Sequence, residues 1–101
     1  MKLGTLFNDI VEGIKGAQKS QMFGKLCYKA NGKSFMCLFN EYIVFKLKGD
    51  IYLIALNIDG AVLFDPSGKG RAMKEWVQVP TSALTDWKLL ALSAFTYVKE
   101  G

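Results

Sequence analysis

Few side chains in this sequence are suited to carry chemistry. There are two cysteines, Cys27 and Cys37, and no histidine. Without histidine the chain lacks the commonest general base and transition-metal ligand, so it cannot form a Ser-His or Cys-His nucleophile pair. The carboxylates lie on separate predicted elements, and no pair is spaced for acid–base work. We therefore predict a non-enzymatic domain with no catalytic residue, no metal site and no cofactor.

One loop has the composition of an anion-binding site. It follows Asp65-Pro66 and is rich in glycine, which exposes backbone N–H groups, and in positive charge. It is not a P-loop, because glycine rather than serine or threonine follows the lysine. The alternative is a solvated turn between two strands. The candidate anion-binding residues are Ser67, Gly68, Lys69, Gly70 and Arg71.

Composition indicates one small domain spanning residues 1–101. Half of the residues are apolar and 22% are charged, which is enough apolar material for one core. The net charge is +4, and the lysines are spread from Lys2 to Lys99, which favours a solvated surface over a nucleic-acid-binding stripe. No stretch approaches the ~20 apolar residues of a membrane span, and Asp9 and Glu12 argue against a signal peptide. We expect a cytoplasmic protein without membrane association.

Hydrophobic periodicity predicts an α+β domain. Apolar residues recur at helical spacing near both ends of the chain, and a period of two dominates between them. The predicted elements are a helix over 3–19, strands over 22–29, 34–39 and 42–47, a short helix over 50–57, strands over 61–65 and 73–79, and a helix over 85–99. This α-β-β-β-α-β-β-α order predicts two layers, a five-stranded antiparallel sheet with helices packed on one face.

Two registers are open for the first hairpin. A two-residue turn at Asn31-Gly32 would turn Lys25 and Lys29 towards the core, whereas a three-residue loop with Gly32 in the left-handed conformation avoids this. A one-residue slip moves every side chain to the other face, so the choice of register decides which residues are buried. We prefer the second register because it keeps the two lysines out of the core. It predicts a core face made of Leu26, Tyr28, Met36, Leu38, Ile43, Phe45 and Leu47.

The same register decides the expectation for the cysteines. They could form a redox pair, or be two small apolar residues within strands. In the preferred register Cys27 lies opposite Phe35, and Cys37 is a diagonal neighbour at ~7–8 Å. A disulfide needs Cα atoms closer than ~7 Å. We therefore predict two free thiols.

The opposite face of the sheet is unusually aromatic for a solvated surface. It would need cover from a partner, for which a second copy of the chain is the simplest choice. The alternative is that the last helix folds across this face and covers it. The candidate interaction residues are Phe35, Phe39, Tyr42, Lys46, Lys74 and Trp76.

Several short motifs together resemble a known family. They are Met22-Phe23-Gly24, Gly32-Lys33 before Phe35, Leu38, Gly60, Phe64, and Trp76-Val77-Gln78-Val79-Pro80. Over roughly residues 20–100 the chain resembles the N-terminal domain of the TfoX/Sxy-type competence regulators and their stand-alone relatives. The resemblance implies a two-layer α+β fold and a bacterial protein that acts through partners, including in transcription. The chain ends at Gly101 without the regulators' C-terminal domain, so a competence role is not expected.

Three functional hypotheses follow. The first is a regulatory domain that binds a protein partner or forms a homodimer. The second is a nucleic-acid-binding module, because aromatics interleaved with lysines on a sheet can stack bases. The third is a small-ligand-binding domain or an enzyme, which needs a pocket between sheet and helices. The molar mass in solution, with and without nucleic acid, discriminates among them.

Overall fold

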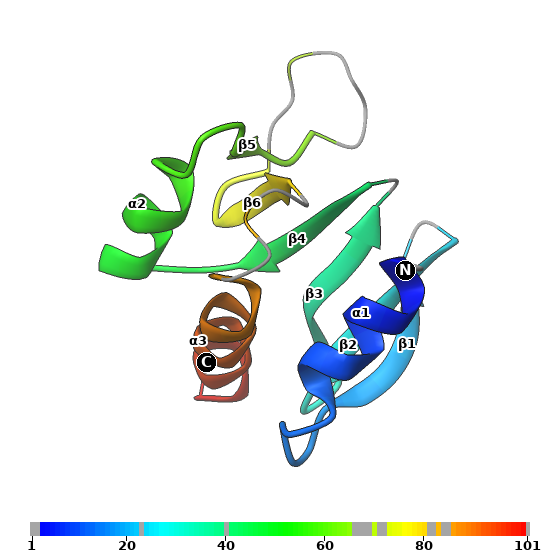
Figure 1. The fold of residues 1–101 in the computed structure, drawn as a ribbon. Coiled ribbons are helices and arrows are strands. Elements are labelled where there is room, and N and C mark those ends of the chain that lie inside the picture. Colours follow the sequence, from blue (N-terminus) through cyan, green and yellow to red (C-terminus); the bar gives the residue numbers. More distant parts are fainter. Residues whose placement is uncertain are drawn as a thin grey trace.

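The structure, a computed structural model, describes residues 3–22, 24–39, 41–65, 70, 73–80, 83 and 86–100. Its elements are α1 (Leu3–Val11), β1 (Gln18–Met22), β2 (Lys25–Ala30), β3 (Lys33–Phe39), β4 (Tyr42–Lys46), α2 (Asp50–Leu56), β5 (Val62–Leu63), β6 (Trp76–Pro80) and α3 (Trp87–Glu100). In this described part of the chain, six strands form one antiparallel sheet in the order β1-β2-β3-β4-β6-β5 (Figure 1). The predicted α+β class is confirmed.

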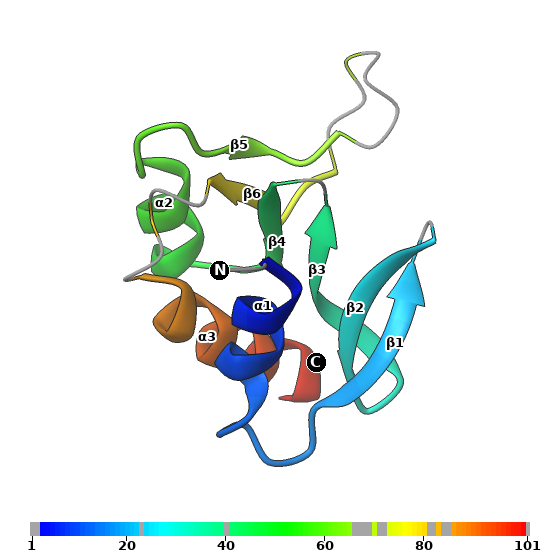
Figure 2. The ribbon, with the colours of Figure 1, turned by 45° about the vertical axis from the view of Figure 1, so that its right-hand side comes forward.

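The prediction of five strands is wrong, because the sheet has a sixth strand. The predicted element order is wrong for the same reason, since this strand follows the first helix. The first helix ends at Val11 instead of continuing to residue 19, and residues 18–22 form β1. Gly16 has a φ of +100°, outside the range of a right-handed α-helix, so the helix cannot continue to residue 19. Residues 18–22 instead pair with β2 as an edge strand (Figure 2).

The three helices pack against one face of the sheet. Their buried side chains form a single core with the inward residues of β2, β3, β4 and β6. On α1, the ring of Phe7 packs 5.4 Å from the ring of Tyr28, and the Tyr28 hydroxyl donates a 2.6 Å hydrogen bond to Asn8. On α3, the indole N–H of Trp87 donates to the Pro80 carbonyl at 3.3 Å. The predicted position of helices on one face is confirmed.

The first hairpin combines features of both registers considered from the sequence. Ala30 pairs with Lys33, so the turn is the two-residue Asn31-Gly32 turn, with φ values of 52° and 79°. A β-bulge then shifts the register, and Tyr28 pairs with Met36. The predicted core face is therefore correct, although the predicted three-residue loop is wrong. The bulge adds Phe35 to β3 without a partner on β2, so the pairing beyond it is shifted by one residue, which regular alternation in the sequence does not predict.

The later elements match the sequence expectations more closely. The short helix α2 begins at Asp50 as predicted, and α3 occupies nearly the predicted range. β5 and β6 are shorter than predicted, and Pro80 lies inside β6, where it pairs with Tyr42. None of the helices in the described residues has the length and apolar character needed to cross a membrane.

Candidate functional site

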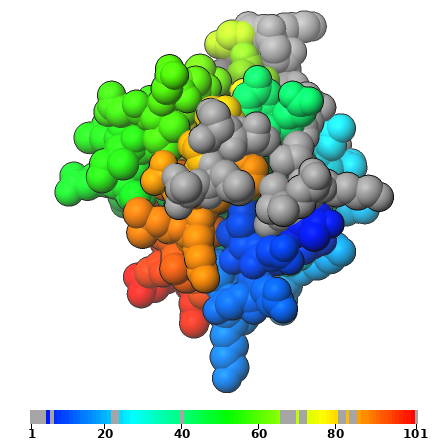
Figure 3. Space-filling view, viewed as in Figure 1, coloured from blue at the N-terminus to red at the C-terminus, as the bar shows by residue number. Residues whose placement is uncertain are grey.

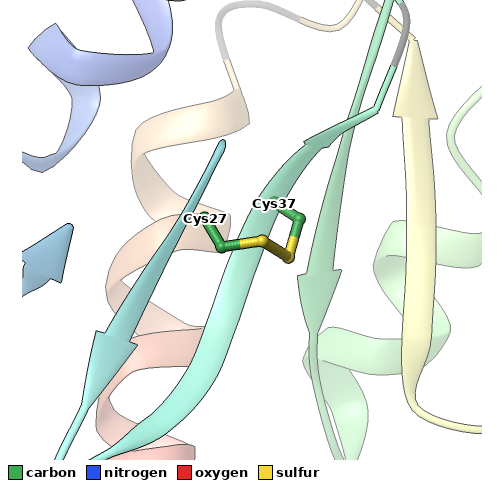
Figure 4. Close-up of a disulfide and its surroundings, with 2 residues drawn as sticks. All are labelled: Cys27 and Cys37. Atoms are coloured by element: carbon green, nitrogen blue, oxygen red, sulfur yellow. A yellow bond between two sulfur atoms is a disulfide. The ribbon is translucent and has the colours of Figure 1, made fainter. Parts of the chain in front are cut away.

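The face of the sheet opposite the helices carries a disulfide between Cys27 and Cys37 (Figure 4). The prediction of two free thiols is wrong. The bulge places Cys27 directly opposite Cys37 instead of opposite Phe35, with 4.1 Å between their Cα atoms. A directly opposed cross-strand pair is within reach of a disulfide, whereas the diagonal pair expected from the sequence is not.

Both cysteines are shielded from solvent by other side chains of this chain. Cys27 is 0% and Cys37 is 2% exposed, and both belong to a buried cluster with Val44, Phe64 and Trp76. We call these five residues the disulfide cluster. Phe39 and Met73 pack against its edge. The rings of Phe39 and Phe64 meet edge to face at 5.0 Å.

The cover over this face comes from β5 and the residues that follow it. The Phe64 amide donates to the Trp76 carbonyl, and the Met73 amide donates to the Phe64 carbonyl, each at 2.8 Å. These bonds extend the β5–β6 pairing by one residue and bring Phe64 beside Trp76. The alternative in which the last helix covers this face is wrong, because α3 packs on the opposite face.

The predicted interaction residues do not form one exposed surface. Phe35 is fully buried in the helix-side core, 5.3 Å from the ring of Phe95, because it is the extra residue at the bulge. Trp76 is only 7% exposed. The others remain at least partly accessible, namely Phe39, Tyr42, Lys46 and Lys74.

Two lysines lie over aromatic rings at this face. The ammonium of Lys25 is 5.6 Å from the ring centroid of Phe39, and that of Lys46 is 5.8 Å from the ring of Trp76. Such cation–π contacts contribute about 0.5–1 kcal/mol at exposed positions. They also place charge where the hydrophobic cluster meets solvent, so little apolar surface is left here for a partner.

Most of the predicted anion-binding loop, namely Ser67, Gly68, Lys69 and Arg71, lies outside the described residues. Its remaining member, Gly70, donates its amide to the Asp65 carboxylate at 2.8 Å. In this arrangement the Gly70 N–H already has an anionic acceptor from its own chain.

A surface that the sequence analysis missed lies on α2 and α3. Leu53 and Ile54 on α2 are 57% and 58% exposed, and Leu89 and Leu92 on α3 are 57% and 43% exposed. The two helices contact each other, and their outer surfaces adjoin in the space-filling view, where α2 is green and α3 is orange to red (Figure 3). We call these four residues the helix surface. Leu89 and Leu92 lie at helical positions away from the buried stripe of α3, so the sequence could have predicted the α3 part of the helix surface.

A polar contact connects α3 to the start of β6. The Tyr97 hydroxyl donates a 2.9 Å hydrogen bond to Glu75, whose backbone has an unusual φ of +73°. This bond to the carboxylate, together with burial, raises the pKa of Tyr97 above its ordinary value of 10.0. The Lys48 ammonium lies 5.8 Å from the centre of the Tyr97 ring.

Small cavities adjoin this tyrosine. One of about 190 Å³ is lined by Lys33, Lys46, Tyr97 and Val98. It is smaller than the usual pocket for a drug-sized ligand. In the part of the chain that the structure describes, no three His, Cys, Asp or Glu side chains group as a metal site would require.

Comparison with models of known protein families, with curated proteins and with solved structures gives no match for this chain.

Proposed function

We propose that this chain is a non-enzymatic regulatory domain that acts by self-association, with the helix surface as its interface. The observation that carries the proposal is the exposure of Leu53, Ile54, Leu89 and Leu92 on two helices in contact. Clustered exposed apolar residues mark interaction sites, whereas single ones scattered over a surface are ordinary.

The charges beside these residues favour a second copy of the chain as the occupant. Asp50 is exposed at the start of α2, and Lys88 is exposed beside Leu89 on α3. In a two-fold interface each contact between two different residues occurs twice. Packing α2 of one copy against α3 of the other would bring aliphatic residues together and would place the opposite charges of Asp50 and Lys88 on the two helices that meet.

The test is the molar mass in solution, measured by light scattering over a range of concentrations. We expect the wild type to reach twice the 11.2 kDa chain mass. Ile54→Glu and Leu89→Glu should each give the monomer mass without loss of helix content, because a carboxylate would be desolvated in the interface. Val62→Glu is the matched control, because Val62 is 50% exposed but lies on β5.

A charge exchange tests the two-fold arrangement itself. Asp50→Lys and Lys88→Asp should each weaken the dimer by placing like charges together, and the double variant should recover affinity. A wild type that stays monomeric at every concentration would overturn self-association. A dimer that survives both glutamate variants would show that the interface lies elsewhere.

The resemblance to TfoX/Sxy-type domains supports a further part of the proposal, a bacterial cytoplasmic protein connected with transcription regulation. The alternative function is nucleic-acid binding through the lysines and aromatics on the face of the sheet opposite the helices. The positive charges of Lys25 and Lys46 on this face favour that alternative through contacts to phosphates, whereas their positions over the rings of Phe39 and Trp76 leave little ring surface for base stacking. It predicts binding to single-stranded nucleic acid that falls steeply with salt, and the absence of such binding leaves self-association as the proposal.

A further inference from the structure

We propose that the Cys27–Cys37 disulfide is a thiol–disulfide exchange site whose reaction partner is a dithiol, and that opening of the β5 edge controls access to it. This inference is independent of the proposed self-association, because the disulfide lies on the opposite face of the sheet from the helices. It rests on the position of the pair in the sheet and on the residues that cover it.

The position of the pair allows both redox states within one fold. Cys27 and Cys37 are register partners in the β2–β3 ladder and are only 10 residues apart in the sequence. The bond therefore closes a loop that the hairpin hydrogen bonds already close, so its loss releases little additional chain entropy in the folded state. Reduction leaves two small apolar thiols facing each other in a buried site, a common environment for free cysteine.

The exchange reaction balances with a dithiol as the reductant. One thiolate of the dithiol attacks a sulfur of the pair, which forms a mixed disulfide and releases the other cysteine as a thiolate. The second thiolate of the dithiol then breaks the mixed disulfide and leaves as a disulfide. Two electrons pass to Cys27 and Cys37, and each sulfur takes up one proton from water to become a thiol.

Access to the sulfurs requires movement of the disulfide cluster, since both cysteines are almost fully buried. Its cover depends on β5, a two-residue strand at the edge of the sheet. Phe64 is attached to β6 by one backbone hydrogen bond and to Met73 by another. A short edge strand with few backbone bonds opens at a lower free energy than the whole domain. Attack by the dithiol should therefore follow local opening of this edge.

The experiment measures the rate at which dithiothreitol reduces the oxidised protein, by alkylation of the new thiols and mass spectrometry. We expect two thiols to appear together, faster than the global unfolding rate extrapolated from urea. Phe64→Ala should raise the rate by about tenfold or more, because it removes a fully buried ring of the disulfide cluster that is held by the β5 edge. Val62→Thr is the matched control, because it keeps a β-branched side chain at an exposed position of the same strand, and it should change the rate by less than about twofold.

Phe64→Leu provides a second variant that keeps most of the cover if Phe64→Ala does not fold. Its reduction rate should lie between those of the wild type and Phe64→Ala. If Phe64→Ala does not fold, Phe64→Leu should still be reduced faster than the wild type. Reoxidation with oxidised glutathione should restore the disulfide. The proposal is overturned if oxidised glutathione never closes the bond, if reduction proceeds only at the global unfolding rate, or if the Phe64 variants react no faster than Val62→Thr.

Discussion

The two faces of the sheet are covered in different ways. On one face, three helices from both ends and the middle of the chain meet the inward residues of four strands in one continuous core. On the other face, a much smaller cluster is covered by a neighbouring edge strand and the residue pair Phe64 and Trp76. The first arrangement depends on contacts distant in sequence, so it should be lost only with the whole fold. The second depends on a few bonds at one edge.

The difference separates the two proposed activities. The disulfide, which we propose to react with a dithiol, lies beneath the cover that we expect to open at the lower free energy. The exposed aliphatic residues lie on α2 and α3, outside the strongly packed core. A partner that binds the helices would leave the disulfide cluster untouched. Variants on each face should therefore report on different properties of the molecule.

The largest expected effect is at the centre of the helix-covered face. Phe45 is fully buried and pairs with Met36 on one side and Val77 on the other. Phe45→Ala should lower the free energy of unfolding by ~3–5 kcal/mol, because it leaves a cavity within the continuous core. Urea unfolding followed by circular dichroism measures the loss. A loss below ~1 kcal/mol would mean that this face is not the principal core.

A smaller effect is expected at Trp76 on the opposite face. Trp76→Glu should lower the free energy of unfolding by about 2–4 kcal/mol, because it removes a buried ring and places a carboxylate within the disulfide cluster, where Lys46 can partly compensate its charge. Lys74→Glu is the control, because Lys74 is exposed two residues away and should change little. Hydrogen exchange should show faster opening at 62–64 in Trp76→Glu. Equal stability of the two variants would show that this face is not covered.

The sequence predicted the helix-covered face well because periodicity reports burial directly. Tyr28, Ile43 and Phe45 alternate with polar or outward residues, and each lies in the core. The short helix at Asp50 and the last helix were also predicted at nearly their observed positions, although Gly49 rather than Asp50 is the N-cap of α2. The prediction made the first helix too long, because the apolar spacing continues to Ile14, whereas Gly16 has a left-handed backbone conformation.

The opposite face was harder to predict because a β-bulge and the pairing of β5 together decide which of its residues are buried. A single bulged residue turned Phe35 into the core and brought Cys27 opposite Cys37. No periodicity of 2 or 3.6 encodes such an insertion, although two cysteines in adjacent strands could have prompted a search for it. The cover by Phe64 depends on which edge β5 joins, and this is a long-range pairing that local pattern does not specify.

The smallest expected effect compares two tyrosines that connect helices to the sheet. Burial raises the pKa of Tyr28, whereas the hydrogen bond to the Glu75 carboxylate is the main cause of the raised pKa of Tyr97. Both shifts favour the protonated form in the folded state. Their stabilising contribution is therefore complete below the ordinary pKa of 10.0 and is lost as the pH rises through the folded value.

Tyr97→Phe should cost about 0.5–1 kcal/mol at neutral pH and should flatten the loss of stability above about pH 10. Tyr28→Phe should also flatten the loss of stability in this pH range, because desolvation raises the pKa of Tyr28 in the same direction. Salt should lower only the smaller Coulombic part of the raised pKa of Tyr97, because ions screen the charge of Glu75 but leave the hydrogen bond and the burial unchanged. Glu75→Gln keeps an acceptor for the Tyr97 hydroxyl without the charge, so it should retain most of the neutral-pH stability and reproduce part of the flattening. Thermal unfolding between pH 8 and pH 11 measures these differences, and identical pH profiles for wild type and Tyr97→Phe would contradict the assignment.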